Sequence, residues 1–485
     1  MPRGPRLNNI SKNFTTRDSL GIEGVAATIQ GEICPVVNTV TPRAFYWPFM
    51  VWIYYDFYEY SGIKEYNYNA FDEYLKRQDY FFVMATLLTE GSDQSGLVGK
   101  QQTQIDIDNN PSGPYEFNPK YFKTRFGGMQ YYNAGCLSMY FVTDHDDATG
   151  KEFALPRLSQ HGKKMAIAFE SVIKNTRYYK EYRRNDKAVP RTVLEEYGKV
   201  INFGLQGFNE CKAILREYLF EQLPGRRDLL TDNANLIRYI IDTYKVSDWN
   251  RAACRQMFYD NELSTGEKII IPSELLEVSH KWEIVVGRQY FTSGIEMIWK
   301  YMLGILNEPL TIKEWIELAV NESSFSWNLE NSLGSVLGEC NYNYSDRELM
   351  IGDATHNQNI KYMLENGIKV ILSVYNRFRF REDLGDEKTF MRYGYENQSI
   401  PLQELFDTVD EYKNISIEDF MVLVIRKWII EQHYATAFEK MLQNRDGFFY
   451  ELVDDKYIKK HDFDMRFQDI RMTSLRQVMM DIDML

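Results

Sequence analysis

Residues 44–60, AFYWPFMVWIYYDFYEY, form the densest aromatic stretch of the chain. The apolar side chains are too closely spaced for a stripe on one helix face, so we expect a helix buried on most sides. The apolar run stops at Asp56, short of the roughly 20 residues that span a bilayer. We favour a core element; the alternative is an exposed protein–protein interface rich in Tyr and Trp.

A charged residue, Arg43, directly precedes this stretch, and a charge that enters a core has to find a partner there. The candidate interface residues of the region are Arg43, Tyr46, Trp47, Phe49 and Trp52.

Helical periodicity recurs along the rest of the chain, with prolines between the segments. The expected helices are 70–89, 163–174, 208–222, 233–244, 282–306, 360–377 and 417–444. Residues 120–142 are rich in β-formers, and residues 448–459 alternate around Asp454-Asp455, typical of a hairpin. The sequence therefore predicts a mainly α (α+β) fold: a multi-helix scaffold with small strand-containing, winged-helix-like modules.

These patterns divide the chain into four consecutive parts. We expect a flexible basic arm (1–17), an aromatic-rich helical and winged-helix-like domain (18–160), a helical domain (161–410) and a C-terminal helix-hairpin-helix module (411–485). Residues 91–118, rich in Gly and Pro, are expected to form a loop or a mobile insertion.

The charge balance excludes a basic field over the whole molecule. The 485 residues include 56 Lys and Arg against 69 Asp and Glu, a net charge of −13. Five scattered cysteines include no C-x-x-C pair, and the N-terminus has no apolar signal-peptide core. We expect a cytoplasmic protein in a reducing environment.

Motifs of known enzymes are missing. Gly91 and Gly96 have the spacing of a phosphate-binding loop, but Leu97 stands where lysine is required. The dipeptides His145-Asp146 and His461-Asp462 lack recognisable further ligands for a metal. We therefore expect no enzymatic activity, no cofactor, no metal and no small-molecule substrate.

One acidic run keeps a nuclease alternative open. Asp383, Asp386, Glu387 and Lys388 have the ingredients of a carboxylate–lysine nuclease site, although their spacing is wrong for the usual strand-borne set. A solvated loop is the favoured interpretation.

Basic residues gather between residues 174 and 191, interleaved with three tyrosines. The candidate nucleic-acid-binding residues are Lys174, Arg177, Lys180, Arg183, Arg184, Lys187 and Arg191. Seven cations against Glu181 and Asp186 give the stretch a net charge of +5. Such a segment can neutralise phosphates while its rings stack on bases; the alternative is a solvated helix face. Residues 375–381, YNRFRFR, repeat the pattern more weakly.

The N-terminal region resembles a bacterial family. Residues 18–22, DSLGI, and residues 38–54, NTVTPRAFYWPFMVWIY, are similar to its opening signature, D-x-L-G-I followed by S-T-x-T-P-R-A-R-Y-F-x-F-x-P-W. Weaker similarity extends to about residue 310. Phe45 replaces the second arginine of the signature, and Val51 replaces the proline before tryptophan.

The resemblance implies a biological setting, since that uncharacterised family looks like an accessory component of bacterial defence islands, encoded beside helicases, ATPases and nucleases. Our first hypothesis is a non-enzymatic subunit of an anti-phage or DNA-restriction complex that docks an ATPase, helicase or nuclease and contacts DNA. A phage sensor that triggers a toxic partner is the second hypothesis, and a divergent metal-dependent nuclease is the third.

Overall fold

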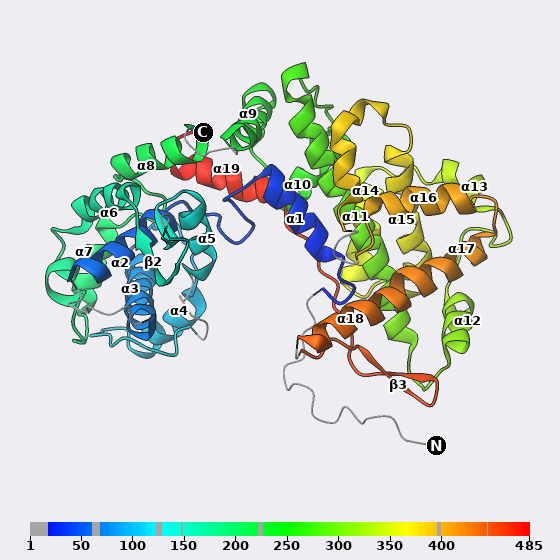
Figure 1. Cartoon of the computed structure of the whole chain (residues 1–485), viewed down its shortest axis with the longest axis horizontal. Coiled ribbons are helices and arrows are strands. Elements are labelled where there is room, and N and C mark those ends of the chain that lie inside the picture. Colours follow the sequence, from blue (N-terminus) through cyan, green and yellow to red (C-terminus); the bar gives the residue numbers. More distant parts are fainter. Residues whose placement is uncertain are drawn as a thin grey trace. The chain divides into compact units, whose positions relative to one another are not determined.

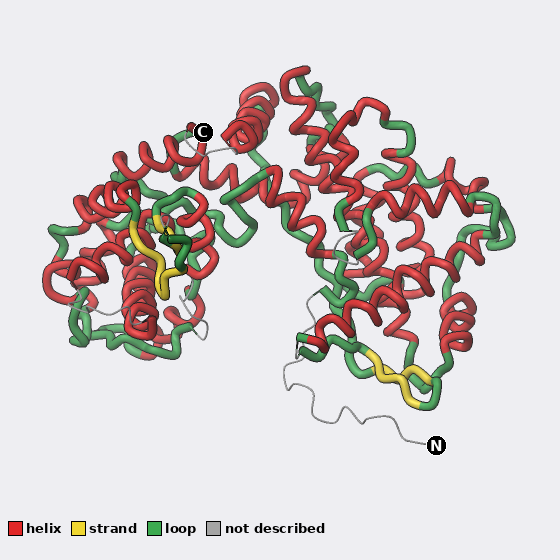
Figure 2. The backbone as a smooth tube through the Cα atoms, in the orientation of Figure 1, coloured by secondary structure: helices red, strands yellow, loops and turns green. Residues whose placement is uncertain are grey.

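A computed structural model of the chain describes residues 18–60, 68–122, 129–146, 149–221, 227–394, 399–443 and 445–485. The predicted arm, 1–17, lies outside the described residues. The chain forms two compact units (Figure 1). Unit 1 combines residues 18–33 with Asp248–Asp469, and unit 2 combines Cys34–Ser247 with Ile470–Leu485. The mainly α prediction is confirmed: in the described parts, strands form only two two-stranded sheets (Figure 2).

Unit 2 is a helical unit with one hairpin. Its helices are α2 (Tyr46–Tyr60), α3 (Tyr68–Leu88), α4 (Lys100–Asn109), α5 (Gln130–Ser138), α6 (Gln160–Ile173), η2 (Tyr178–Tyr182), α7 (Arg191–Val200), α8 (Asn209–Arg216), η3 (Glu217–Glu221), α9 (Arg227–Tyr244) and α19 (Arg471–Asp481). The antiparallel strands β1 (Val142–His145) and β2 (Glu152–Leu158) form the hairpin.

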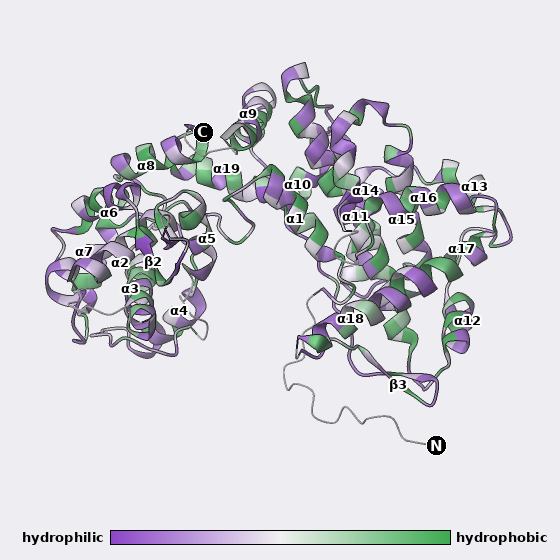
Figure 3. Ribbon diagram, in the orientation of Figure 1, coloured by the Kyte–Doolittle hydropathy of each residue, from purple (hydrophilic) through white to green (hydrophobic). Residues whose placement is uncertain are grey.

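The predicted apolar helix, α2, lies in the core of unit 2. Residues 44–54, Pro48 aside, include ten side chains that are 0% exposed. Phe45, at the start of α2, stacks on Phe82 of α3 with ring centroids 4.5 Å apart and contacts Phe169 of α6 at 5.5 Å. A helix that is apolar on most sides has to be enclosed in this way. Figure 3 shows hydrophobic and hydrophilic residues interspersed along the helices of both units.

Two local expectations in unit 2 are wrong. The stretch 120–142, rich in β-formers, contains the helix α5. This helix packs closely against Trp47, where a Cβ at Gly135 would lie 2.4 Å from the indole nitrogen. The expected loop 91–118 contains α4, which packs on α3. The hairpin β1–β2 gains no third strand within the described residues, and a winged helix is not confirmed there.

Unit 1 is also helical, with one hairpin. Its helices are α1 (Glu23–Ile33), α10 (Arg251–Arg255), η4 (Gln256–Asp260), η5 (Ser273–Leu275), α11 (Leu276–Ile305), α12 (Ile312–Glu322), α13 (Leu333–Val336), η6 (Leu337–Glu339), α14 (Tyr344–Thr355), η7 (Ile360–Tyr362), α15 (Met363–Phe378), η8 (Glu382–Arg392), α16 (Leu402–Tyr412), α17 (Ile417–Val424), η10 (Ile425–Glu431) and α18 (Gln432–Leu442).

The long helix α11 forms the core of unit 1, buried on almost every side from Trp282 to Trp299. It packs against α15 where two glycines meet. A Cβ at Gly294 would lie 2.8 Å from the carbonyl oxygen of Gly367, and a Cβ at Gly367 would lie 2.7 Å from that of Gly294. The two backbones therefore come together only because both positions lack a side chain.

The predicted hairpin near the C-terminus is confirmed. Strands β3 (Tyr450–Val453) and β4 (Lys456–Lys459) pair in antiparallel fashion. Asp454 and Asp455 both have positive φ, 50° and 62°, as the tight hairpin turn requires.

The hairpin and the last helix do not form one module. The hairpin belongs to unit 1, whereas α19 belongs to unit 2. The expected C-terminal winged helix is therefore not confirmed among the described residues, and the two units divide the chain differently from the expected segments 18–160, 161–410 and 411–485. The reason is packing: α19 buries its apolar side chains among earlier elements of unit 2, including α9.

Two general features bear on the sequence expectations. All five cysteines are buried, and none of them forms a disulfide. Across the parts of the chain that the structure describes, no helix has the length and apolar character that crossing a membrane requires.

A buried histidine gives unit 1 a testable pH dependence. His433 Nδ1 donates to the carbonyl oxygen of Ser19 at 2.9 Å, and its Nε2 accepts from the amide of Phe449 at 3.2 Å. Burial lowers its pKa from 6.5 to about 4. The unfolded chain therefore takes up a proton below pH 6.5 that the folded chain takes up only near pH 4, so stability falls as the pH drops through this window.

We expect His433 to contribute about 3 kcal/mol to this loss. The matched variant His433→Asn keeps a donor for Ser19 and lacks the titration. Urea unfolding at pH 7 and pH 4.5 should show a smaller pH-dependent loss for the variant. An equal loss in both proteins would contradict the assignment.

Candidate functional site

The predicted basic stretch lies between α6 and α7, around the short π-helix η2. In the structure its seven cations fall into two groups, those that form ion pairs and those that are exposed without one among the described residues. Arg183 and Arg184 bind a buried carboxylate, and Arg191 pairs with Glu195 at 2.7 Å. The side chains of the remaining four are exposed and form no ion pair with described residues: Lys174, Arg177, Lys180 and Lys187. We call these four residues the exposed basic segment.

The carboxylate that holds the two arginines is Asp56 of α2, whose side chain is 0% exposed. Arg183 Nε lies 3.3 Å from its Oδ1, and Arg184 Nε lies 3.2 Å from its Oδ2. Tyr74 of α3 also donates to Oδ2. Burial, followed by the charge of Asp56, raises the pKa of Tyr74 well above its ordinary value, so the phenol stays a donor.

These contacts change the role of Arg183. Its guanidinium also lies over the ring of Tyr179, 3.5 Å from the centroid, and donates to the carbonyl oxygen of that residue. Arg183 and Arg184 therefore neutralise Asp56 and fix the chain after η2.

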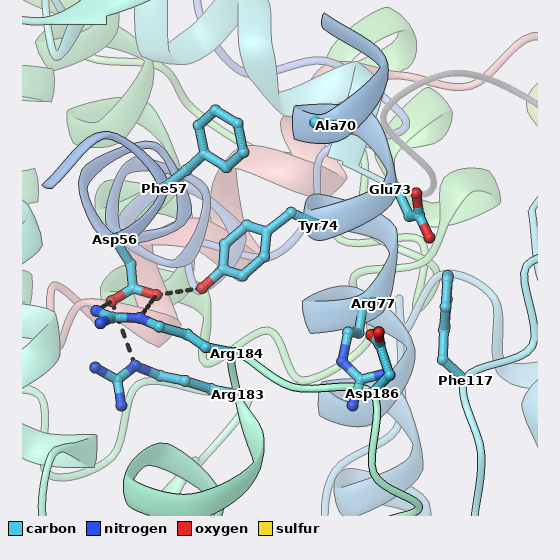
Figure 4. Close-up of a pocket in the computed structure, with 10 residues that line it drawn as sticks. All are labelled: Asp56, Phe57, Ala70, Glu73, Tyr74, Arg77, Phe117, Arg183, Arg184 and Asp186. Atoms are coloured by element: carbon cyan, nitrogen blue, oxygen red, sulfur yellow. Dashed lines mark hydrogen bonds and ion pairs between the residues drawn. The ribbon is translucent and has the colours of Figure 1, made fainter. Parts of the chain in front are cut away.

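A pocket of about 490 Å³ opens beside this ion pair (Figure 4). It lies between the end of α2, one face of α3 and the chain after η2. Its described lining residues are Asp56, Phe57, Ala70, Glu73, Tyr74, Arg77, Phe117, Arg183, Arg184 and Asp186.

Arg77 is the exceptional side chain of this pocket. It is only 7% exposed, and its guanidinium forms no ion pair with a described carboxylate. It donates to the carbonyl oxygen of Lys187 at 3.4 Å and lies 4.9 Å from the ring centroid of Phe81, while its Nε has no hydrogen-bond partner. Asp56, across the pocket, forms its ion pairs with Arg183 and Arg184.

The candidate interface of α2 is core and not surface. Tyr46, Trp47, Phe49 and Trp52 are 0% exposed, because their rings pack against α3, α5 and α6. A partner could not contact them without unfolding unit 2.

Arg43 finds its partners inside the same unit. Its Nε lies 3.0 Å from Asp481 Oδ2 in α19, and Nη1 lies 2.8 Å from Asp93 Oδ2. Its guanidinium also lies 4.1 Å from the ring centroid of Phe203. The amide of Ala44 donates to the same Asp481 oxygen at 2.9 Å. Arg43 is therefore a structural link between α19 and the start of α2.

The second basic run, YNRFRFR, is likewise structural in unit 1. Arg377 and Arg381 lie 2.6 and 2.5 Å from Glu283 of α11, whose side chain is 1% exposed. Arg381 also holds Asp383 at 2.7 Å. Asp383 therefore neutralises an arginine, as a structural carboxylate does.

The other acidic and histidine candidates do not converge. Among the described residues, no group of three His, Cys, Asp or Glu side chains is placed to hold a metal; Asp386 and Glu387 are part of η8. His145 contacts its neighbour Asp144 at 2.8 Å, and Asp147 lies outside the described residues.

Sequence reasoning missed Asp56 and Arg77 as members of the site. For Asp56 a signal exists, because a carboxylate inside an aromatic helix needs a cationic partner. Arg77 carries no such signal, since it lies in an ordinary amphipathic helix and its burial depends on the chain near residues 117 and 187.

Comparisons with known proteins found no match, whether to protein-family models, to curated proteins or to solved structures.

Proposed function

We propose that the chain is a non-enzymatic accessory subunit of a cytoplasmic bacterial anti-phage or DNA-restriction complex, in which unit 2 contacts nucleic acid and a neighbouring ATPase, helicase or nuclease supplies the chemistry. The observation that carries the contact is the exposed basic segment, four cations without a carboxylate partner in a chain of net charge −13. Unpaired surface cations are what a phosphate backbone recruits.

The acidic remainder supports a restricted contact surface. With an overall negative charge, most of the molecule repels a nucleic acid, so binding is confined to the local excess of cations. The setting in defence rests on the N-terminal resemblance alone.

The variant that tests the contact is Lys174→Gln, Arg177→Gln, Lys180→Gln. These side chains are exposed and unpaired, so the fold should tolerate their replacement. We expect affinity for a fluorescent 20-mer duplex or single strand, measured by anisotropy, to fall at least about tenfold. The control Lys313→Gln, Lys361→Gln, Lys388→Gln removes three charges from unit 1. Equal binding by both variants and the unaltered chain would refute the contact.

Charge reversal at Arg183 or Arg184 is a poor test. It would place new carboxylates beside buried Asp56 and destabilise unit 2, so a loss of binding would have two explanations.

The subunit role has a separate test. A tagged chain expressed from its native operon should capture an ATPase, helicase or nuclease neighbour, and nuclease treatment of the lysate should leave that capture intact. A chain recovered alone, or partners lost with the nucleic acid, would contradict protein docking.

A further inference from the structure

A second pocket adjoins the one that contains Arg77. Its volume is about 540 Å³, and its described lining residues are Tyr80, Asp106, Asn109, Asn110, Pro114, Tyr115, Glu116, Phe117, Asn118, Pro119 and Ala188. Phe117 lines both pockets, and both are bounded by α3 and by the chain near Lys187. Each volume falls within the roughly 300–1,000 Å³ of small-molecule sites.

The charges of the two pockets differ. Three arginines line the first, and two of them are committed to Asp56. Arg77 remains as a buried guanidinium with an unpartnered Nε. Glu73 and Asp186 line the same pocket but form no ion pair with it. Phosphate, like carboxylate, matches the planar guanidinium and accepts two of its hydrogen bonds.

The second pocket suits a planar, uncharged group. It holds Asp106 and Glu116 and no described cation. The ring of Tyr80 lies edge-on to that of Phe117, 5.8 Å between centroids, and its hydroxyl is fixed on Asp106 at 2.9 Å. The exposed amide of Asn109 forms no hydrogen bond with a described residue, and it can donate to and accept from a base edge.

We propose that the two pockets together bind a nucleotide, with its phosphate at Arg77 and its base beside Phe117 in the pocket of Asn109. Phe117 provides the stacking surface that a base of any sequence can use.

The position of Lys187 connects this site to the exposed basic segment. Its carbonyl oxygen accepts the hydrogen bond of Arg77, and its neighbours Asp186 and Ala188 line the first and the second pocket. The same chemistry is therefore offered by a free nucleotide and by one unit of a strand. Where the nucleotide belongs to a strand, the inference rests on the proposed function.

The first test uses the unaltered full chain and needs no variant. Isothermal titration with AMP, GMP, CMP and UMP should find at least one that binds about tenfold or more tightly than its nucleoside and than ribose 5-phosphate, because each of these lacks one half of the ligand. The proposal would be overturned if none of the four nucleotides bound with a Kd below about 1 mM. It would also be overturned if nucleotide and nucleoside bound with equal affinity.

Variants then locate the site. Arg77→Met and Phe117→Ala should each weaken nucleotide binding about tenfold or more, whereas Arg466→Met, at an exposed position of unit 1, should leave it unchanged. Thermal melts establish that each variant is folded; Phe117, which is half-buried, serves if Arg77→Met does not fold. A folded Phe117→Ala protein with unchanged nucleotide affinity would overturn the assignment.

Competition with an oligonucleotide distinguishes a free nucleotide from a unit of a strand as the ligand. It also distinguishes the nucleotide site from the proposed nucleic-acid contact. If the ligand is a strand unit, dT12 competes with the nucleotide, and the Lys174→Gln, Arg177→Gln, Lys180→Gln protein loses dT12 but keeps the nucleotide. If the ligand is free, dT12 does not compete. No nucleotide binding by the unaltered chain, with dT12 binding intact, would refute this inference and leave the proposed function standing.

Discussion

A chain that lacks residues 471–485 is expected to lose the folded structure of unit 2. The apolar side chains Met472, Leu475, Val478, Met479 and Ile482 are all buried. At about 1.5–3 kcal/mol each, they contribute about as much as the whole stability of a typical domain, 5–15 kcal/mol. The deletion also removes Asp481, the buried partner of Arg43. Limited proteolysis should cut unit 2 rapidly and spare fragments of unit 1.

Two point variants on α19 compare the loss of stability at a buried position with that at an exposed position. Leu475→Ala, at a fully buried position, should cost about 2–5 kcal/mol. Met480→Ala, 43% exposed, should change stability by less than about 0.5 kcal/mol. Denaturant unfolding compares the two. A truncated chain with unchanged protease resistance, or equal effects of the two variants, would show that α19 does not belong to the core.

The double variant Arg183→Met, Arg184→Met is expected to destabilise unit 2 by about 3–5 kcal/mol near neutral pH. It leaves Asp56 buried and charged with Tyr74 as its remaining described donor. The opposite change, Asp56→Asn, should cost less, because Arg184 is already 32% exposed and both arginines can turn toward water. Urea unfolding measures the difference.

The triple variant, with Asp56→Asn added to the two methionines, is the internal control. It removes the uncompensated charge, so it should be more stable than the double variant, although each substitution alone is destabilising. A triple variant that is less stable than the double by the full cost of Asp56→Asn would mean that the three residues act independently.

The helices that form each core could be predicted from the sequence. Residues 44–60 are apolar on most sides, and such a helix has one stable location, inside a unit. Residues 282–306 have the apolar spacing of a helix, but their burial on every side was not predicted, because Glu283, Arg288 and Glu296 interrupt the apolar pattern. The hairpin at Asp454-Asp455 could also be predicted, because the residues that form its turn are adjacent in the sequence.

Other elements depend on distant contacts. The helix α5 lies in a stretch rich in β-formers, and Gly135 lets it pack closely against Trp47, a residue far away in the chain. The joining of α19 to unit 2 depends on apolar packing against distant elements and on the pair of Arg43 and Asp481, which are 438 positions apart. No local pattern encodes such a pairing.

The site shows the same division. The basic stretch 174–191 could be located from the sequence. Charge alone could not show that Lys180 is exposed whereas Arg183 is paired with a buried carboxylate. That difference arises from Asp56, 127 positions from Arg183 in the chain. Arg77 was missed for the same reason, since its lack of an anionic partner is a property of the folded pocket.

The salt dependence of nucleic-acid binding tests the central claim most directly. The slope of log K against log salt counts the phosphates that protein cations neutralise. For the Lys174→Gln, Arg177→Gln, Lys180→Gln protein, direct phosphate contact predicts a slope shallower than that of the unaltered chain by about 2–3. An unchanged slope, whatever the affinity, would contradict the assignment of nucleic-acid contact to this segment.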